Sequence, residues 1–187
     1  MEKIIKDSLR SHNQALDILS KNQASIEKIA SLCVGSLKNK GKIIFMGNGG
    51  SAADAQHLAA ELVGRFKKER PAMASIALTV NTSCLTAIGN DYGFDEVFSR
   101  QIEALAQPQD LVVGISTSGN SPNIIKAIEK AKQMGIKTVC LLGKDGGKLK
   151  KIADDSLVIS LTDTPRVQEM HILAGHIICE IIENSQT

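Results

Sequence analysis

The sequence predicts an α/β protein whose doubly wound, five-stranded parallel sheet is flanked by helices. Five short runs are apolar throughout instead of alternating, which is typical of strands covered on both faces of a parallel sheet. Stretches with helical spacing separate these runs along the chain. The length of 187 residues, with 43% hydrophobic and 22% charged residues, suits one globular domain with its own core. We therefore expect a single domain over residues 1–187.

Residues 1–39 are expected to form a helical extension ahead of the sheet. Apolar residues in this segment recur mostly at intervals of three, four or seven, and no proline interrupts them. This spacing predicts two helices with a break near Ser20–Gln23. Such helices carry more apolar surface than one small sheet domain can cover, so we expect the extension to mediate oligomerisation.

The hydrophobic period then changes, and the predicted strands begin. They cover Lys42–Gly47, Met73–Val80, Asp110–Ser116, Ile136–Leu142 and Ser156–Leu161. A last helix runs from Pro165 to about Asn184. Crossover connections place the carboxyl ends of parallel strands at one edge of the sheet. Ligand binding is therefore expected in the segments Gly47–Ser51, Asn81–Asp91 and Ser116–Ser121.

Composition argues against several classes of protein. The chain has 3% aromatic residues, no Trp and a net charge of +2, so we expect no nucleic-acid partner. We interpret Lys67, Lys68 and Arg70 as a solvated helix end. No apolar run is long enough for a membrane span, and the polar start MEKIIKDSLR does not resemble a secretory leader. We expect a cytoplasmic protein without a membrane partner.

Cysteine usage agrees with that compartment. The four cysteines are scattered and form no C-x-x-C motif, which favours reduced, mostly buried thiols over disulfides or a zinc knuckle. They are Cys33, Cys84, Cys140 and Cys179.

The first loop, GNGGS at 47–51, leads from a strand into a helix. Its glycines let the backbone approach an anion, and the helix N-terminus offers unpaired N–H groups. Gly47, Gly49 and Ala52 also fit the dinucleotide fingerprint G-x-G-x-x-A. However, Asn81-Thr82-Ser83 follows the second strand, where a ribose-binding acidic residue is required. We therefore predict an anion loop of another kind.

The second loop, STSGNSPN at 116–123, ends the third strand and opens another helix. Four hydroxyl side chains gather within six residues, more than helix capping requires. A phosphomonoester accepts several hydrogen bonds, and a hydroxyl-rich nest at a helix N-terminus supplies the donors. The loop therefore predicts a phosphate site.

Four separated motifs carry a resemblance to a known family. They are IIFMGNGGSAADAQHLAAELVGRF, the pair Asn90-Asp91, the loop STSGNSPN and the tail RVQEMHILAGH. Over nearly the whole chain they resemble the phosphoheptose isomerases, which have the flavodoxin-like sugar isomerase (SIS) fold. The resemblance implies interconversion of sedoheptulose 7-phosphate and D-glycero-D-manno-heptose 7-phosphate through an enediol. This is the first step of heptose synthesis for bacterial surface polysaccharide, lipopolysaccharide or capsule. It also implies a homotetramer with active sites at subunit contacts.

The same resemblance implies roles for individual residues. Glu61 and His176 match the catalytic acid/base positions. One zinc ion per subunit is implied on His57, Glu61, Gln168 and His176. The two roles of Glu61 compete, because a carboxylate bound to zinc is a poorer base, and the sequence leaves both open. The implied substrate-binding residues are Asn48, Gly49, Gly50, Ser51, Glu61, Asn90, Asp91, Ser116, Thr117, Ser118, Ser121 and Gln168.

Three other side chains receive weaker interpretations. Arg65, one turn beyond Glu61, is a candidate to neutralise substrate charge, although a solvent-facing position is the simpler interpretation. His12 and His171 are assigned to helix surfaces.

Two alternative functions remain open on the sequence. One is a non-catalytic SIS-fold protein that binds the DnaA replication initiator. Glu61, Gln168 and His176 together favour the enzyme, because a pure scaffold needs none of them. The other is the sugar-phosphate-sensing domain of a regulator, which the absence of a DNA-binding module in these residues disfavours.

Overall fold

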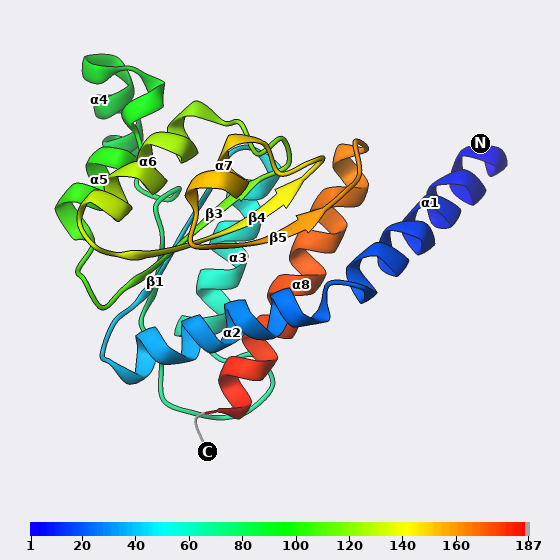
Figure 1. Ribbon diagram of the computed structural model, residues 1–187, viewed down its shortest axis with the longest axis horizontal. Helices are drawn as coiled ribbons and strands as arrows, with labels where there is room; N and C mark the ends of the chain where they lie inside the picture. Colours follow the sequence, from blue (N-terminus) through cyan, green and yellow to red (C-terminus); the bar gives the residue numbers. More distant parts are fainter. Residues whose placement is uncertain (186–187) are drawn as a thin grey trace.

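The computed structural model describes residues 1–185 and confirms the predicted parallel sheet (Figure 1). The strands are β1 (Ile43–Gly47), β2 (Ser75–Ala77), β3 (Leu111–Ser116), β4 (Lys137–Gly143) and β5 (Asp155–Ile159). They lie in the order β2-β1-β3-β4-β5, and every neighbouring pair is parallel. This is the doubly wound, flavodoxin-like order.

Helices cover both faces of the sheet. They are α1 (Glu2–Ser20), α2 (Gln23–Lys38), α3 (Gly50–Val63), α4 (Thr82–Tyr92), the 3₁₀ turn η1 (Phe94–Glu96), α5 (Ser99–Leu105), α6 (Pro122–Gln133), α7 (Gly147–Ile152) and α8 (Thr164–Asn184). Successive strand residues point to opposite faces, so Ile43 and Phe45 join the core under α2, α3 and α8. Ile44 and Met46 join the second core, under α5 and α6. Burial on both faces explains why β1 is apolar throughout.

Two strands are shorter than predicted. The run Met73–Val80 contributes only Ser75–Ala77 to the sheet, because β2 is an edge strand with a partner on one side alone. The Leu78 amide still donates to the Phe45 carbonyl, at 2.9 Å, before the chain turns away. The run Ser156–Leu161 ends as β5 at Ile159, where the Leu161 amide turns back to the Ile159 carbonyl.

The N-terminal extension has the predicted break between two helices. α1 ends at Ser20 and α2 begins at Gln23. In Figure 1, α1 reaches away from the body of the molecule, and Ile4, Ile5 and Leu9 are 60–71% exposed. None of the helices formed by residues 1–185 combines the length and apolarity that a bilayer crossing requires.

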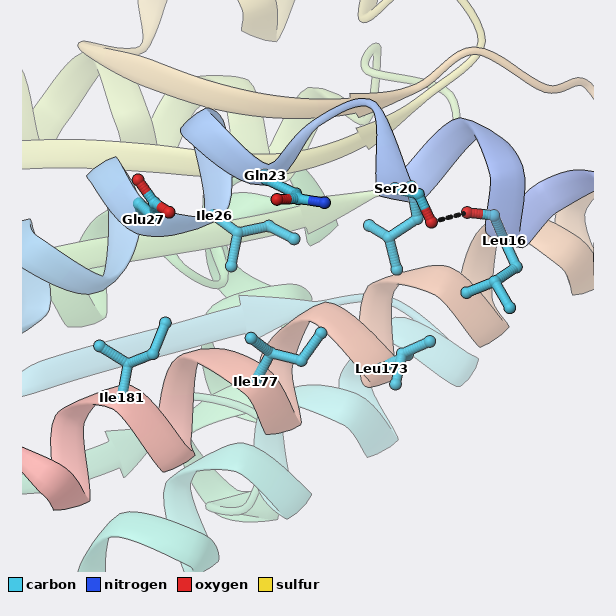
Figure 2. A pocket seen from close by; sticks show the side chains of 9 residues that line it. Leu16, Ser20, Gln23, Ile26, Glu27, Leu173, Ile177 and Ile181 are labelled. Carbon is cyan, nitrogen blue, oxygen red and sulfur yellow. Dashed lines mark hydrogen bonds between the residues drawn. The ribbon is translucent and has the colours of Figure 1, made fainter.

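An apolar groove lies where the extension meets α8 (Figure 2). Its volume is about 330 Å³. Leu16 and Ile26 line it from α1 and α2, and Leu173, Ile177 and Ile181 line it from α8. Together with the exposed face of α1, this groove forms an apolar surface that the rest of the described chain does not cover, as the sequence predicts for the extension.

The cysteines are free thiols, and three of them are buried as predicted. Burial raises the pKa of Cys33, Cys140 and Cys179 to about 12, so these thiols are inert packing groups. Cys84, on α4, is only half-buried.

Two interpretations of polar residues are wrong. His171 does not lie on a helix surface: it is fully buried, because it faces the core side of α8. Arg70 is not part of a solvated helix end. Its side chain is 7% exposed and pairs with Glu183, at 3.2 Å. The helix ends earlier, at Val63, and Arg70 lies in the connection to β2.

Candidate active site

The two predicted loops meet at the carboxyl edge of the sheet. β1 and β3 are neighbours, but the chain leaves β1 toward β2 and leaves β3 toward β4 on the other side. Such a switch point opens a crevice in doubly wound sheets. The N-termini of α3 and α6 both face it, so unpaired N–H groups and two positive dipole ends converge there.

A reciprocal amide pair ties the loops together. Asn48 donates from Nδ2 to Oδ1 of Asn123, and Asn123 donates back to Oδ1 of Asn48, both at 2.9 Å. Asn123 is 2% exposed. Sequence reasoning assigned no role to Asn123, although a polar residue directly after Pro122 in a helix's first turn was an available signal.

The side chain of Gln168, on α8, lies against Gly50 at the start of α3. A Cβ atom at this position would collide with the side-chain amide of Gln168. Gly49 adopts a φ of +54°, a conformation that other residues rarely adopt. The structure therefore brings Gln168 to the first loop, where the resemblance places a substrate contact.

The hydroxyl groups of the second loop form a connected cluster. Ser116 Oγ lies 2.9 Å from Ser121 Oγ and 3.5 Å from Ser118 Oγ. The backbone amides of Gly119 and Asn120 donate to Ser116 and Ser118. Ser121 occupies the N-cap of α6, yet its side chain makes no capping hydrogen bond. Its hydroxyl is therefore not explained as a helix cap.

Thr117 lies in the same loop and is half-buried. The loop rests on neighbouring turns: a Cβ on Gly119 would collide with the Gly146 carbonyl, and one on Gly143 with the Thr117 carbonyl. Only glycine fits at either position, which holds the hydroxyl cluster in place. Ser51, in the first turn of α3, is buried.

A second cluster joins α3 to α8. His57 Nε2 lies 3.0 Å from Glu61 Oε1, as the i, i+4 spacing predicts, and 3.4 Å from His176 Nε2. One nitrogen or oxygen atom from each of the three residues lies within 4.8 Å of the others. The structure therefore assembles a cluster of two imidazoles and a carboxylate. The Glu61 side chain is 21% exposed and that of His57 is 48% exposed.

The fourth implied metal ligand, Gln168, lies near the first loop. Seven residues separate Gly50 from His57 on α3, which is about 10 Å along the helix axis. The Gln168 amide rests against Gly50, in the first turn of α3. The structure brings together His57, Glu61 and His176, three of the four implied metal ligands.

Asn90 and Asp91 lie elsewhere in the chain. They form the last turn of α4, both exposed, and the Asn90 amide donates to Asp91 at 2.8 Å. Among residues 1–185 no hydrogen bond links either side chain to the two loops. α4 itself has no buried residue and stands apart from the sheet (Figure 1). Arg65 is also exposed, 4.0 Å from Glu69, as the solvent-facing interpretation predicts.

Asp54 is an acidic residue of this region that sequence reasoning missed. It lies on α3 between the first loop and His57, and its Oδ2 is buried without a hydrogen-bond partner in the described part of the chain. Burial raises the pKa of the Asp54 carboxyl, although His57 opposes the shift. The spacing of Asp54, His57 and Glu61 along one helix face was the signal that could have identified it.

Fold and site together define a protein of the sugar isomerase class. A family model described as SIS domain matches residues 9–143. The chain is 53% identical over 185 residues to a phosphoheptose isomerase of Nitratiruptor sp., covering 99% of each protein.

Solved structures agree with this relationship. Phosphoheptose isomerase GmhA from Neisseria gonorrhoeae superposes with a TM-score of 0.93 at 42% identity, over 98% of each chain. A phosphoheptose isomerase from Francisella tularensis superposes with a TM-score of 0.94 at 35% identity, over 97% of each chain. The chain belongs to the phosphoheptose isomerase family.

Proposed function

We propose that this chain interconverts sedoheptulose 7-phosphate and D-glycero-D-manno-heptose 7-phosphate, the first step of heptose synthesis for surface polysaccharide. Its full-length relatives are phosphoheptose isomerases. The observation that carries the chemistry is the pairing of Glu61 with two imidazoles between α3 and α8. The non-catalytic alternative is not favoured, because a scaffold would not need this constellation.

The reaction moves a carbonyl by one carbon, which requires a base, an acid and stabilisation of an enediolate. In our proposal Glu61 removes the proton from the carbon beside the carbonyl. His57 holds the Glu61 carboxylate from 3.0 Å and thereby fixes its direction. His176 carries a proton for ring opening or for the return step.

The phosphate end of the substrate is assigned to the second loop. Ser116, Thr117, Ser118 and Ser121 supply hydroxyl groups, and the α6 N-terminus supplies a favourable dipole. In the proposal, Asn48 to Ser51 and Gln168 contact the sugar, and the closeness of the Gln168 amide to Gly50 supports a shared role. The sugar hydroxyls provide partners for these amides.

We further propose a homotetramer in which subunit contacts complete each site. About 10 Å of helix separates the His57 cluster from the loop edge, and Asn90 and Asp91 face solvent on α4. The exposed apolar face of α1 and the groove beside it supply surface for such contacts. In the proposed tetramer, elements of a neighbouring subunit would lie beside these elements and complete the site.

Zinc is proposed as the metal of this site. An imidazole nitrogen and a carboxylate oxygen are ordinary zinc ligands, and His57, Glu61 and His176 present such atoms close together, so the residues fit the ion. When bound, zinc would polarise oxygen atoms of the substrate and stabilise enediolate charge. Gln168, whose amide lies against Gly50, is proposed as the fourth ligand.

The experiment is direct conversion of substrate. Purified protein is mixed with sedoheptulose 7-phosphate, with and without zinc, and the aldose phosphate is followed by NMR. We expect conversion by the wild type and a loss of about 10²–10⁴ in kcat for Glu61→Gln. Glu103→Gln, whose side chain is 57% exposed on α5, serves as the matched control and should retain activity. No conversion by the wild type under either condition would contradict the proposal.

A further inference from the structure

The imidazole of His176 lacks the hydrogen bond that usually orients a functional histidine. Such rings are normally fixed by a carboxylate or carbonyl group on their second nitrogen. His176 uses Nε2 to approach His57, and within residues 1–185 no hydrogen bond holds its Nδ1 atom. Packing must therefore set the orientation of this ring.

The packing comes from one aromatic side chain outside the helices. The ring of Phe66 stacks on His176 with centroids 5.5 Å apart and an interplanar angle of 27°. The edge of His57 closes the arrangement, 4.9 Å away at 76°. His176 is thus held between a phenyl face and a second imidazole.

Phe66 belongs to a connection that is firmly attached to α8. Residues 64–74, here called the strap, lead from α3 to β2 and pass the C-terminal end of α8 (Figure 1). The carboxylate of Glu183 accepts hydrogen bonds from the backbone amides of Phe66, Lys67 and Lys68, at 2.8–3.1 Å. Burial opposes the charged form of Glu183, but these amides and Arg70 outweigh it and lower the pKa of the carboxyl.

Arg70 extends the same anchor to the other catalytic candidate. Its Nε atom donates to Glu183 at 3.2 Å, and its Nη2 atom donates to the backbone carbonyl of Glu61 at 2.8 Å. The Arg70–Glu183 pair is almost completely buried. One buried ion pair therefore fixes both the Glu61 turn of α3 and the backbone that carries Phe66.

We propose that Phe66 is a positioning residue for the isomerase reaction, holding the His176 imidazole in its working orientation from a strap anchored by Glu183 and Arg70. This inference rests on the proposed function. It concerns the same site but assigns a role to a residue that touches neither the reacting atoms nor the phosphate loop. Phe66 acts through its ring face, so a residue with a ring should replace it and an aliphatic residue should not.

The test compares three variants with the wild type. Phe66→Leu removes the ring but keeps an apolar side chain, and Phe66→Tyr restores the ring. Lys68→Ala is the matched strap control, because its side chain points to Asn184 while its backbone amide still reaches Glu183. For each protein, kcat and KM are measured with sedoheptulose 7-phosphate, and zinc affinity is measured separately by competition with a chromophoric chelator.

We expect Phe66→Leu to lower kcat and zinc affinity by about 10–100-fold with little change in KM, the usual cost of losing support behind a ligand. Phe66→Tyr and Lys68→Ala should match the wild type. Unchanged zinc affinity and kcat in Phe66→Leu would overturn the inference, as would equal losses in Lys68→Ala or Phe66→Tyr. If Phe66→Leu does not fold, Phe66→Met makes the same comparison. An inactive wild type would refute the proposed function, while the zinc titrations would still decide the role of Phe66.

Discussion

Acidification is expected to destabilise this fold through His171. The imidazole is fully buried on α8, and neither ring nitrogen makes a hydrogen bond of good geometry with the described residues. Burial lowers the pKa of His171 from 6.5 to about 4, although the nearby backbone of Leu142 offsets part of the effect. A charged imidazole in this core would lack both water and a counter-charge.

The size of the effect follows from proton linkage. The unfolded chain binds this proton near pH 6.5 and the folded chain only near pH 4. The contribution of neutral His171 to the free energy of unfolding is therefore fully present above pH 6.5 and declines as the pH falls toward 4. At about 1.4 kcal/mol for each pH unit, the lowered pKa of His171 reduces the free energy of unfolding by about 3 kcal/mol below pH 4 and by about 2 kcal/mol at pH 5.

Urea unfolding at pH 7.5 and pH 5.0 measures this difference, at one protein concentration because the proposed assembly would also stabilise the fold. From pH 7.5 to pH 5.0 the free energy of unfolding should fall in both proteins, and the fall should be about 2 kcal/mol smaller in His171→Leu than in the wild type. The control His12→Gln removes a histidine whose side chain is 40% exposed. Its free energy of unfolding should fall between the two pH values by at least as much as that of the wild type. If His171→Leu and the wild type have the same pH dependence, His171 is not the responsible group.

Three further expectations concern the site and the assembly. Ser121→Ala should raise KM about tenfold with little change in kcat, because the hydroxyl makes no helix cap and its proposed phosphate contact would be the same in ground and transition states. Steady-state kinetics checks this, and a fall in Tm with unchanged KM would refute it. His57→Ala should lower zinc content after loading and desalting, measured by elemental analysis, while circular dichroism stays that of a folded protein; equal zinc in both proteins would refute the assignment. Light scattering should give a tetramer at micromolar concentration, and a 20.0 kDa particle would exclude the proposed subunit contacts.

The fold was largely predictable because its signals are local. β1, β3 and β4 are short apolar runs buried on both faces, and each is followed by turn residues and a helical period. The boundaries of β2 and β5 were not predictable to the residue. An apolar run does not reveal where a neighbouring strand stops offering backbone partners.

The candidate site was predictable where its parts are close in sequence. His57 and Glu61 share a helix face by spacing alone, and the loop 116–121 shows its hydroxyl groups directly. Asp54 belonged to the same pattern and was missed because its burial is a property of the packed helix. The meeting of Asn48 with Asn123 depends on two strands becoming neighbours in the sheet.

By itself, the sequence determined the parallel α/β architecture, the positions of the two loops rich in glycine and serine, and the family resemblance, because each rests on local periodicity or on contiguous motifs. Only the tertiary structure decided that His171 is buried, that Gln168 rests on Gly50, and that Arg70 and Glu183 anchor Phe66 against His176. Glu183 and Arg70 are separated by more than a hundred residues, and each alone looks like an exposed charge. The desolvation and hydrogen bonding of Glu183 and Arg70 arise only after α3, the strap and α8 have packed, so no pattern along the chain could predict them.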